Sequence, residues 1–402
     1  MFWKLNRAIK LIVLIMRKLV LCFLIAKVCT VCVGQTVQFT NEVFGKVIDL
    51  KLDNETAMPW YFGSVFQYCD DTDLLAYWNG ITKSIKYFDL ESGETVKETK
   101  LSPYGPEAIP GEPYYFYYHN KDSIFIFSEF QNSKLFLVND RGGKVDTFDF
   151  EAKDGYRFTP FPRLTRVSGA IVVHKEHFFL SFNISEQKER NSVAPVLKYN
   201  MVTKEHGFLK EPGAYRDLDL SRIPKGGQHE FYESRLAFNA DNNEMVINYP
   251  LSQKLYVLRD GIVKEVEAKS KSVKGFELLS RDKNRFEVND VGYKKIVFGS
   301  ARYFGIFYDQ YNKLFYRLVK LDNVSKTESK YLSNSKKYVP DSYSWMIFDS
   351  GLSKKTEVLF TSREATPEKG VFVSPKGLWV LLPNSKGEDI MSIGLLKFNE
   401  KD

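Results

Sequence analysis

The chain has 402 residues and a formal net charge of +7, with 44% hydrophobic and 15% aromatic residues. Six of the 57 basic residues lie in the first 34 positions, which hold no Asp or Glu, so the remaining 51 nearly balance the 50 acidic residues. A domain without a basic excess lacks the electrostatic footprint that nucleic-acid binding needs, and we expect no nucleic-acid partner.

Residues 1–34 have the arrangement of a signal peptide, with a charged start, an apolar centre and a small-residue end. The segment Leu19–Val33 is interrupted by a lysine and is short for a membrane-spanning helix, which needs about 20 apolar residues. Cys32-Val33-Gly34 before Gln35 resembles a cleavage site. We therefore predict an exported protein in the periplasm, at the cell surface or secreted. Lipid attachment, a retained anchor (either would give membrane association) and a true start at Met16 are the alternatives.

Three of the four cysteines, Cys22, Cys29 and Cys32, lie inside this leader, which leaves Cys69 alone in residues 35–402. One cysteine cannot form an intramolecular disulfide, and thiolate metal sites need several ligands. We predict that Cys69 is a small packing residue and that the protein uses no metal or other cofactor.

From residue 37 onward, short apolar or alternating runs are separated by turns rich in Gly, Asn, Asp, Ser and Lys. This spacing predicts an all-β fold, and the aromatic content favours sheet. A strand–turn–strand unit recurs in imperfect copies, which is typical of repeat architectures. The predicted strand segments are, in chain order, 74–78, 84–90, 95–96, 123–127, 134–138, 144–145, 170–173, 196–200, 244–249, 254–258, 262–264, 303–308, 313–320, 345–348, 355–360, 370–373, 377–382 and 393–398.

These units predict a β-propeller, a ring of four-stranded blades, as a single domain over residues 35–402. Six blades would hold about 61 residues each, beside roughly 40 to 50 in common blades, so six blades with long loops or seven blades both fit. We expect the first strand after the leader, around Val47–Leu52, to join the last blade and close the ring. A large sandwich or two β domains are the alternatives, although no Pro-, Gly- or Ser-rich linker separates two domains.

Four segments, Phe161–Leu164, Tyr249–Leu251, Phe307–Arg317 and Gly370–Leu382, together resemble a family of exported Bacteroidota proteins known as domain of unknown function 4221. The resemblance covers most of residues 35–402 and implies a six-bladed propeller. Members are often lipoproteins, but this leader departs from the lipoprotein pattern, because valine rather than a small residue precedes each candidate cysteine. The resemblance implies no activity.

No sequence motif names a reaction: there is no phosphate-binding GxxxxGK[ST], no GxSxG elbow and no HExxH. His174 and His177 form a short His-x-x-His, and zinc sites do use paired histidines. Residues three apart in a strand point to opposite faces, so these two would converge only in a turn. We expect a polar hairpin turn here.

Ligands usually meet a propeller at the mouth of its axial channel, which the loops entering each innermost strand would line. Arginine suits planar or anionic groups, and Trp and Tyr offer flat faces for stacking. A structural role, such as bridging adjacent blades, is the alternative for each residue. The predicted ligand-binding residues are Trp60, Tyr61, Arg163, Arg166, His229, Arg302 and Tyr303, and no catalytic residue is assigned.

The leading hypothesis is a monomeric, non-catalytic binding or scaffold module for an envelope protein, a peptide or a glycan. The alternative is a carbohydrate-active hydrolase or lyase at the channel mouth. It needs a converging acid–base pair, which linear sequence cannot show for candidates such as Glu230 or Asp309. A membrane-retained sensor domain is a third possibility that depends on the fate of the leader.

Overall fold

The computed structural model describes residues 43–56, 66–129, 133–150, 158–159, 171–181, 183–184, 196–209, 212–215, 218, 231, 234–276, 296–323, 340–383 and 386–398. These residues belong to one compact unit, Glu42–Asp402. They form six four-stranded antiparallel sheets, which are the blades of a β-propeller. The predicted all-β propeller is confirmed, with six blades rather than seven.

Blades 1 to 3 follow one another in the first half of the domain, and in each blade the strands are ordered from the axis outward. A separate two-stranded ribbon, β10 with β13, accompanies blade 3 in the chain. Blade 1 is β2 (Phe66–Cys69), β3 (Leu74–Asn79), β4 (Ser84–Asp89) and β5 (Thr95–Lys100); blade 2 is β6 (Glu112–Asn120), β7 (Ser123–Glu129), β8 (Lys134–Val138) and β9 (Lys144–Asp149); blade 3 is β11 (Ile171–His174), β12 (His177–Ser181), β14 (Val196–Asn200) and β15 (His206–Phe208); the ribbon is β10 (Phe158–Thr159) and β13 (Asn183–Ile184).

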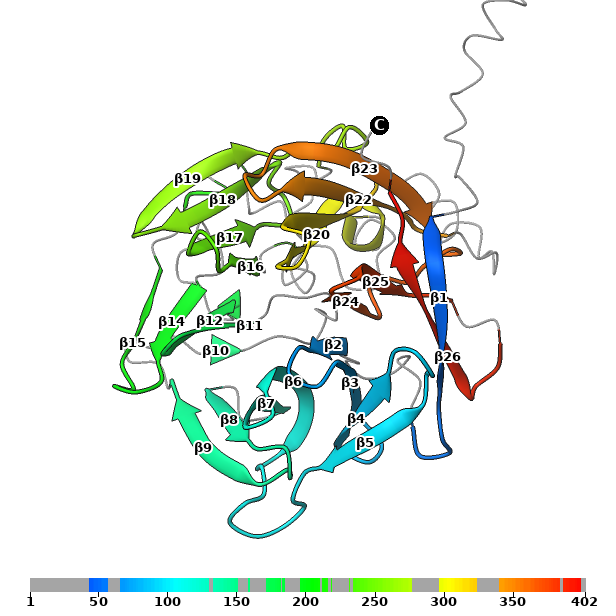
Figure 1. Cartoon of the computed structure of the whole chain (residues 1–402). Coiled ribbons are helices and arrows are strands. Elements are labelled where there is room, and N and C mark those ends of the chain that lie inside the picture. The colour runs from blue at the N-terminus through cyan, green and yellow to red at the C-terminus, as the bar shows by residue number, and fades with distance from the viewer. Residues whose placement is uncertain are drawn as a thin grey trace, which may run out of the picture. The chain divides into compact units, whose positions relative to one another are not determined.

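Blades 4 to 6 complete the ring (Figure 1). Blade 6 takes its outermost strand from the start of the domain. Blade 4 is β16 (Arg235–Asn239), β17 (Glu244–Asn248), β18 (Lys254–Arg259) and β19 (Ile262–Glu267); blade 5 is β20 (Arg302–Asp309), β21 (Leu314–Lys320), β22 (Ser342–Asp349) and β23 (Lys354–Thr361); blade 6 is β24 (Val371–Ser374), β25 (Gly377–Leu381), β26 (Ile390–Leu396) and β1 (Phe44–Lys51).

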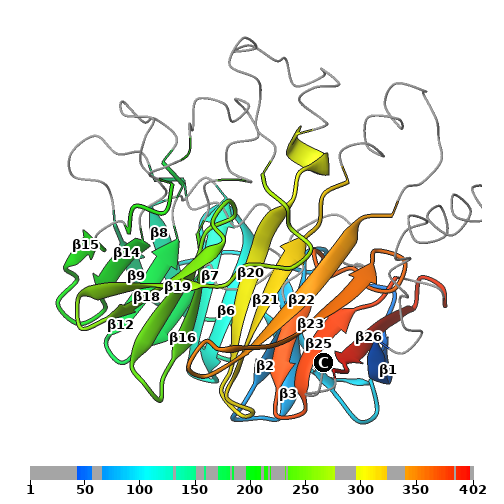
Figure 2. The ribbon, with the colours of Figure 1, turned by 90° about the horizontal axis from the view of Figure 1, so that it is seen from above.

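The ring closes where β1 pairs antiparallel with β26, so that the two ends of the domain share one sheet. Ile48 faces Ile393 and Leu50 faces Met391 in this register, and all four side chains are buried. The predicted closure by a strand near Val47–Leu52 is therefore confirmed, with the strand starting three residues earlier. In Figure 2 the blades stand side by side, and their strands run between the two faces of the ring.

Hydrophobic side chains fill the space between adjacent blades rather than a single central core. Blades 2 and 3, for example, meet through Phe148, Phe178 and Tyr199, with the last two rings stacked at a centroid distance of 4.7 Å. Aromatic rings carry large apolar areas and pack well in such offset arrangements. Many of the Phe and Tyr residues of the sequence thus pack between blades.

Two glycines in outer hairpin turns let neighbouring blades approach closely. Gly93, between β4 and β5, has φ +73°, and a Cβ built on it would lie 2.0 Å from the carbonyl oxygen of Asp49 in β1. Gly142, between β8 and β9, has φ +82° and would place a Cβ 1.9 Å from the carbonyl oxygen of Lys100. Only glycine fits such a left-handed turn with no room for a side chain.

Within the described ranges, no helix combines the length and the hydropathy needed to cross a membrane. The leader 1–34 and its cleavage site lie outside those ranges. His174 and His177 face each other at the ends of β11 and β12, and Lys175 between them has φ +52°. The expected hairpin turn is confirmed, and among the described residues no cluster of His, Cys, Asp or Glu could hold a metal ion.

Candidate functional site

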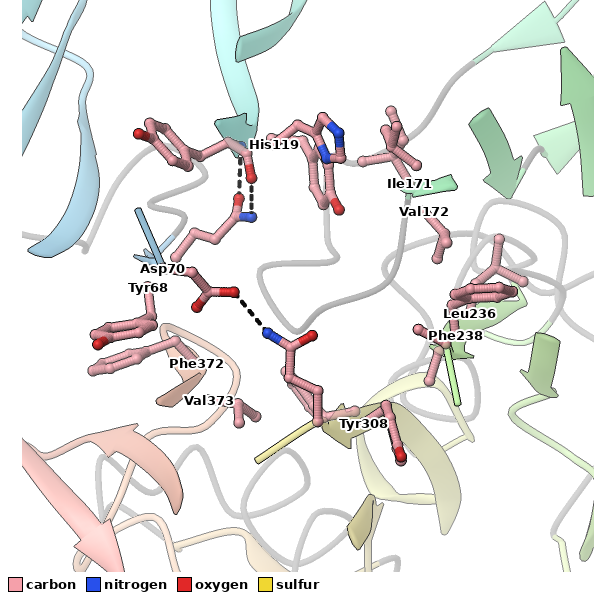
Figure 3. Close-up of a pocket in the computed structure, with 18 of the residues that line it drawn as sticks. Tyr68, Asp70, His119, Ile171, Val172, Leu236, Phe238, Tyr308, Phe372 and Val373 are labelled. Atoms are coloured by element: carbon pink, nitrogen blue, oxygen red, sulfur yellow. Dashed lines mark hydrogen bonds between the residues drawn. The ribbon is translucent and has the colours of Figure 1, made fainter. Parts of the chain in front are cut away.

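The innermost strand of every blade borders a cavity on the axis of the ring, with a volume of about 440 Å³ (Figure 3). Because successive side chains of a strand point to opposite faces, some residues of each inner strand pack between blades while others reach the axis. The cavity is thus built by strands that are distant in sequence and fixed by the blades behind them. Its strands are β2, β6, β11, β16, β20 and β24.

Most residues that line the cavity are aromatic or aliphatic, but polar and apolar atoms contribute about equally to its surface, because many of the rings are tyrosines. Ligand sites commonly combine an apolar lining with a small number of placed polar groups. The aromatic lining residues are Phe66, Tyr68, Tyr115, Tyr117, Tyr118, Phe238, Phe307, Tyr308, Tyr311 and Phe372. The polar lining residues, apart from the tyrosines, are Gln67, Asp70, His119, His174 and Gln310.

Asp70 makes a link between two blades that are not neighbours. It lies in the turn after β2 of blade 1, and its carboxylate accepts hydrogen bonds from Gln310 Nε2 at 2.6 Å and from the Tyr311 hydroxyl. Both donors lie in the turn after β20 of blade 5, so the link passes blade 6. Figure 3 shows Asp70 directed toward the interior of the ring, with the bond to Gln310 dashed.

The turn that carries these two donors is fixed by Asp309. Its buried carboxylate accepts hydrogen bonds from the backbone N–H of Tyr311 at 3.0 Å and of Asn312 at 2.8 Å. Aspartate favours such local side-chain-to-backbone bonds at the start of a turn. Asp309, one of the two acidic residues considered for catalysis, therefore holds the turn that presents Gln310 and Tyr311; Glu230 lies outside the described residues.

Other bonds at the same end of the inner strands join adjacent blades. Asp71 accepts from the Tyr118 hydroxyl at 2.7 Å and from the backbone N–H of Lys121 at 2.9 Å, which joins blades 1 and 2. Asp241 accepts from the Tyr308 hydroxyl at 2.8 Å and pairs with Lys313 Nζ at 2.6 Å, which joins blades 4 and 5. These contacts fix the positions of the tyrosine rings around the cavity.

The lining holds few groups that can carry a charge. Burial raises the pKa of the Asp70 carboxyl, as does the nearby charge of Asp71, and the hydrogen bond from Gln310 only partly opposes this rise. Burial lowers the pKa of His119 and of His174, which favours neutral imidazoles at pH 7, and it raises the pKa of Tyr117 to about 12. No Lys or Arg occurs among the described lining residues, so Asp70 sets the charge of this wall.

The residues predicted to bind a ligand do not line this cavity where the structure describes them. Arg302 and Tyr303 open β20 but are buried: Arg302 Nη1 donates to the carbonyl of Val297 at 2.6 Å, and the guanidinium of Arg317 lies 3.5 Å from the centre of the Tyr303 ring. Both side chains take part in packing rather than facing the axis. Their role in ligand binding stays a prediction. The other five, Trp60, Tyr61, Arg163, Arg166 and His229, lie outside the described residues.

Asp70, Gln310 and Tyr311 were not singled out from the sequence. They occupy turns after inner strands, whereas the predicted site lay in the loops that enter those strands. Gln310 and Asp70 are 240 positions apart, and only the curvature of the ring brings them together. A signal did exist locally, since aromatic residues surround both turns, as in Tyr308 and Tyr311.

Comparison with known proteins agrees with the propeller fold. The profile of a family described as a domain of unknown function, DUF4221, matches residues 36–354. The chain belongs to the DUF4221 family. A crystal structure of a DUF4221 member from Bacteroides vulgatus is similar with a TM-score of 0.65 and 17% identity, covering 88% of this chain and 97% of that one.

A second solved structure, a Bacteroides fragilis protein named for its inferred export, gives a TM-score of 0.51 at 9% identity. It covers 90% of this chain and 98% of that one. At these identities the likeness concerns the fold. No curated protein matches the DUF4221 chain.

Proposed function

We propose that this DUF4221 protein is an exported, non-catalytic binding module that holds a peptide, a glycan or a segment of an envelope protein in its axial cavity. The observation that carries the proposal is the wall of the cavity, in which five of the six inner strands contribute Phe or Tyr rings beside polar groups such as Asp70, His119 and Gln310. The signal-like leader and the name of the Bacteroides fragilis relative support export.

The rigidity of the wall supports binding. The inner strands are each hydrogen-bonded to the rest of a blade, and links such as Asp71 to Tyr118 fix neighbouring blades to each other. Because the side chains of such a wall are already ordered, they lose little conformational entropy when a ligand binds. Aromatic faces held in this way can stack on sugar rings or on the side chains of a peptide.

One observation favours the alternative, a carbohydrate-active hydrolase or lyase. Asp70 and His119 line the same cavity, and a carboxylate with an imidazole can serve as an acid–base pair. Glycoside hydrolysis commonly uses two carboxylates, whereas the described lining contributes Asp70 as its one carboxylate. The two functions are therefore separated by whether a captured ligand is returned unchanged.

The test uses protein that starts at Gln35 and a variant that fills the cavity. Ala240 lines the cavity just after β16 and is exposed, so Ala240→Trp places an indole in the opening with little effect on folding. Val145→Trp on the outer strand β9, where Val145 is 58% exposed, is the matched control. Each protein is immobilised and exposed to fractionated native envelope and to arrays of glycans and peptides.

We expect the wild type and Val145→Trp to capture the same component, Ala240→Trp to lose it, and the component to be recovered chemically intact. Equal capture by Ala240→Trp, or no capture at all, would contradict binding in the cavity. Recovery of a cleaved product would instead establish the enzymatic alternative.

A further inference from the structure

The charge at the mouth of the cavity is unbalanced. The Asp70 carboxylate is solvent-accessible and has two neutral hydrogen-bond donors, Gln310 and Tyr311, and among the described residues no cation pairs with it. Asp241, in the turn after β16, differs in this respect because Lys313 Nζ lies 2.6 Å from its carboxylate. The turns after β2 and β16 thus each carry a carboxylate, but a lysine neutralises the one at Asp241. Of the two, only Asp70 lines the cavity.

Aromatic rings lie beside this carboxylate and across the cavity from it. The Tyr68 and Tyr311 rings meet edge to face with centroids 6.3 Å apart, and Tyr311 also donates its hydroxyl to Asp70. Figure 3 shows Tyr308 and Phe238 on the same ring of side chains around the cavity. Ring faces attract cations through their quadrupole, and the attraction grows when the cation is removed from water.

The carboxylate retains acceptor capacity beyond its two present bonds. An ionised carboxylate has about four lone-pair sites, and the described donors use two of them. Neighbouring Asp71 adds negative potential at the same mouth. A ligand anion would meet repulsion here, whereas a cation would be attracted by Asp70 and by the ring faces together.

From these contacts we infer that the ligand of the axial cavity is an organic cation, a protonated amine or quaternary ammonium group on an apolar body, and that Asp70 is the group that selects its charge. The inference deepens the proposed function and rests on it. The cation can belong to a free small molecule or to a lysine side chain of a peptide, since both present the same chemistry to Asp70.

The test measures binding of charged probes against neutral probes of the same shape, by calorimetry or ligand-observed NMR. Choline is compared with 3,3-dimethyl-1-butanol, and benzylamine with benzyl alcohol. A short lysine peptide and its norleucine counterpart distinguish the peptide source from the free small molecule. The proteins are the wild type, Asp70→Asn, and Asp260→Asn as a control, since Asp260 is 74% exposed in the turn between β18 and β19 and does not line the cavity.

We expect each cation to bind the wild type at least about tenfold more tightly than its neutral partner, and Asp70→Asn to lose that preference while Asp260→Asn keeps it. Tighter binding of the lysine peptide than of both small cations would assign the peptide source, and the reverse order the free molecule. The comparison within the wild type stands alone if Asp70→Asn does not fold.

Neutral probes that bind as well as cations would overturn the inference, as would an unchanged preference in Asp70→Asn. The proposed function fails separately. If a glycan or peptide is captured in a manner that Ala240→Trp abolishes but Asp70→Asn does not affect, binding in the cavity holds and selection by charge is wrong. If neither variant changes any capture, the cavity is not the binding site.

Discussion

Replacing Gly93 by alanine should strain the contact between the outer turn of blade 1 and strand β1 of blade 6. The added Cβ would lie 2.0 Å from the carbonyl oxygen of Asp49, and real Cβ contacts stay above 3.0 Å, so β1 must move away by about 1 Å. That movement also stretches the hydrogen bond from Lys51 N to the Gly93 carbonyl, now 2.8 Å. Alanine at φ +73° further costs about 1–2 kcal/mol, because its Cβ crowds the carbonyl.

Gly261→Ala separates these contributions. Gly261 lies in the turn between β18 and β19 with φ +78°, and a Cβ there meets nothing within 4 Å. Both variants are destabilised by an alanine in a left-handed turn, and both are stabilised equally because alanine makes the unfolded chain less flexible. Gly93→Ala alone adds the overlap with β1 and the weakened hydrogen bond, which together amount to about 2 kcal/mol or more.

Urea unfolding monitored by tryptophan fluorescence measures this difference directly. We expect the free energy of unfolding of Gly93→Ala to lie about 2 kcal/mol or more below that of Gly261→Ala. Gly142→Ala, whose Cβ would meet the Lys100 carbonyl oxygen at 1.9 Å, should resemble Gly93→Ala. Equal losses in all three variants would refute the close approach of these turns to the neighbouring blades.

Three further variants or probes test the packing and electrostatics of the ring. Arg317→Met should lower the free energy of unfolding by about 4 kcal/mol, because the buried guanidinium donates to Asn248 Oδ1 and to backbone carbonyls that would lose their partner. The control Arg259→Met, at a side chain that is 59% exposed, should change the free energy of unfolding by less than about 0.5 kcal/mol. Burial raises the pKa of the Cys69 thiol, so a thiol reagent should label it in urea but not in native buffer; rapid native labelling would contradict its burial. The hydrogen bond from Lys386 lowers the pKa of Asp49, so the ionised Asp49 stabilises the fold above its ordinary pKa, and this stabilisation is lost as pH falls through the folded-state pKa. Urea titrations at several pH values should therefore show that Asp49→Asn loses less stability than the wild type below about pH 4.

The blade pattern could be predicted from the sequence because outer and middle strands alternate in polarity and end in turns with strong local signals. Glu91-Ser92-Gly93 and Arg141-Gly142-Gly143 are such turns. The inner strands β2, β6 and β16 were not recognised. Residues 114–118 read Tyr-Tyr-Phe-Tyr-Tyr, without alternation, because side chains on both faces of an inner strand contact protein or cavity.

The site was less predictable for the same reason. The polar group at its mouth, Asp70, stands in a run of turn-forming residues, Asp70-Asp71-Thr72-Asp73, in which nothing local distinguishes it from its neighbours. Its partners come from blade 5, and the bond between them exists only because the ring is closed. A local pattern reports how a blade is built, but not which side chains the ring brings to its axis.

Native mass spectrometry of the protein isolated from its own envelope tests most directly whether the axial cavity is a binding site. We predict that the wild type and Val145→Trp carry a bound molecule of defined mass, and that Ala240→Trp, expressed in the same cells, carries none. The same adduct on Ala240→Trp, or no adduct on the wild type, would contradict the assignment of the cavity as the site of function.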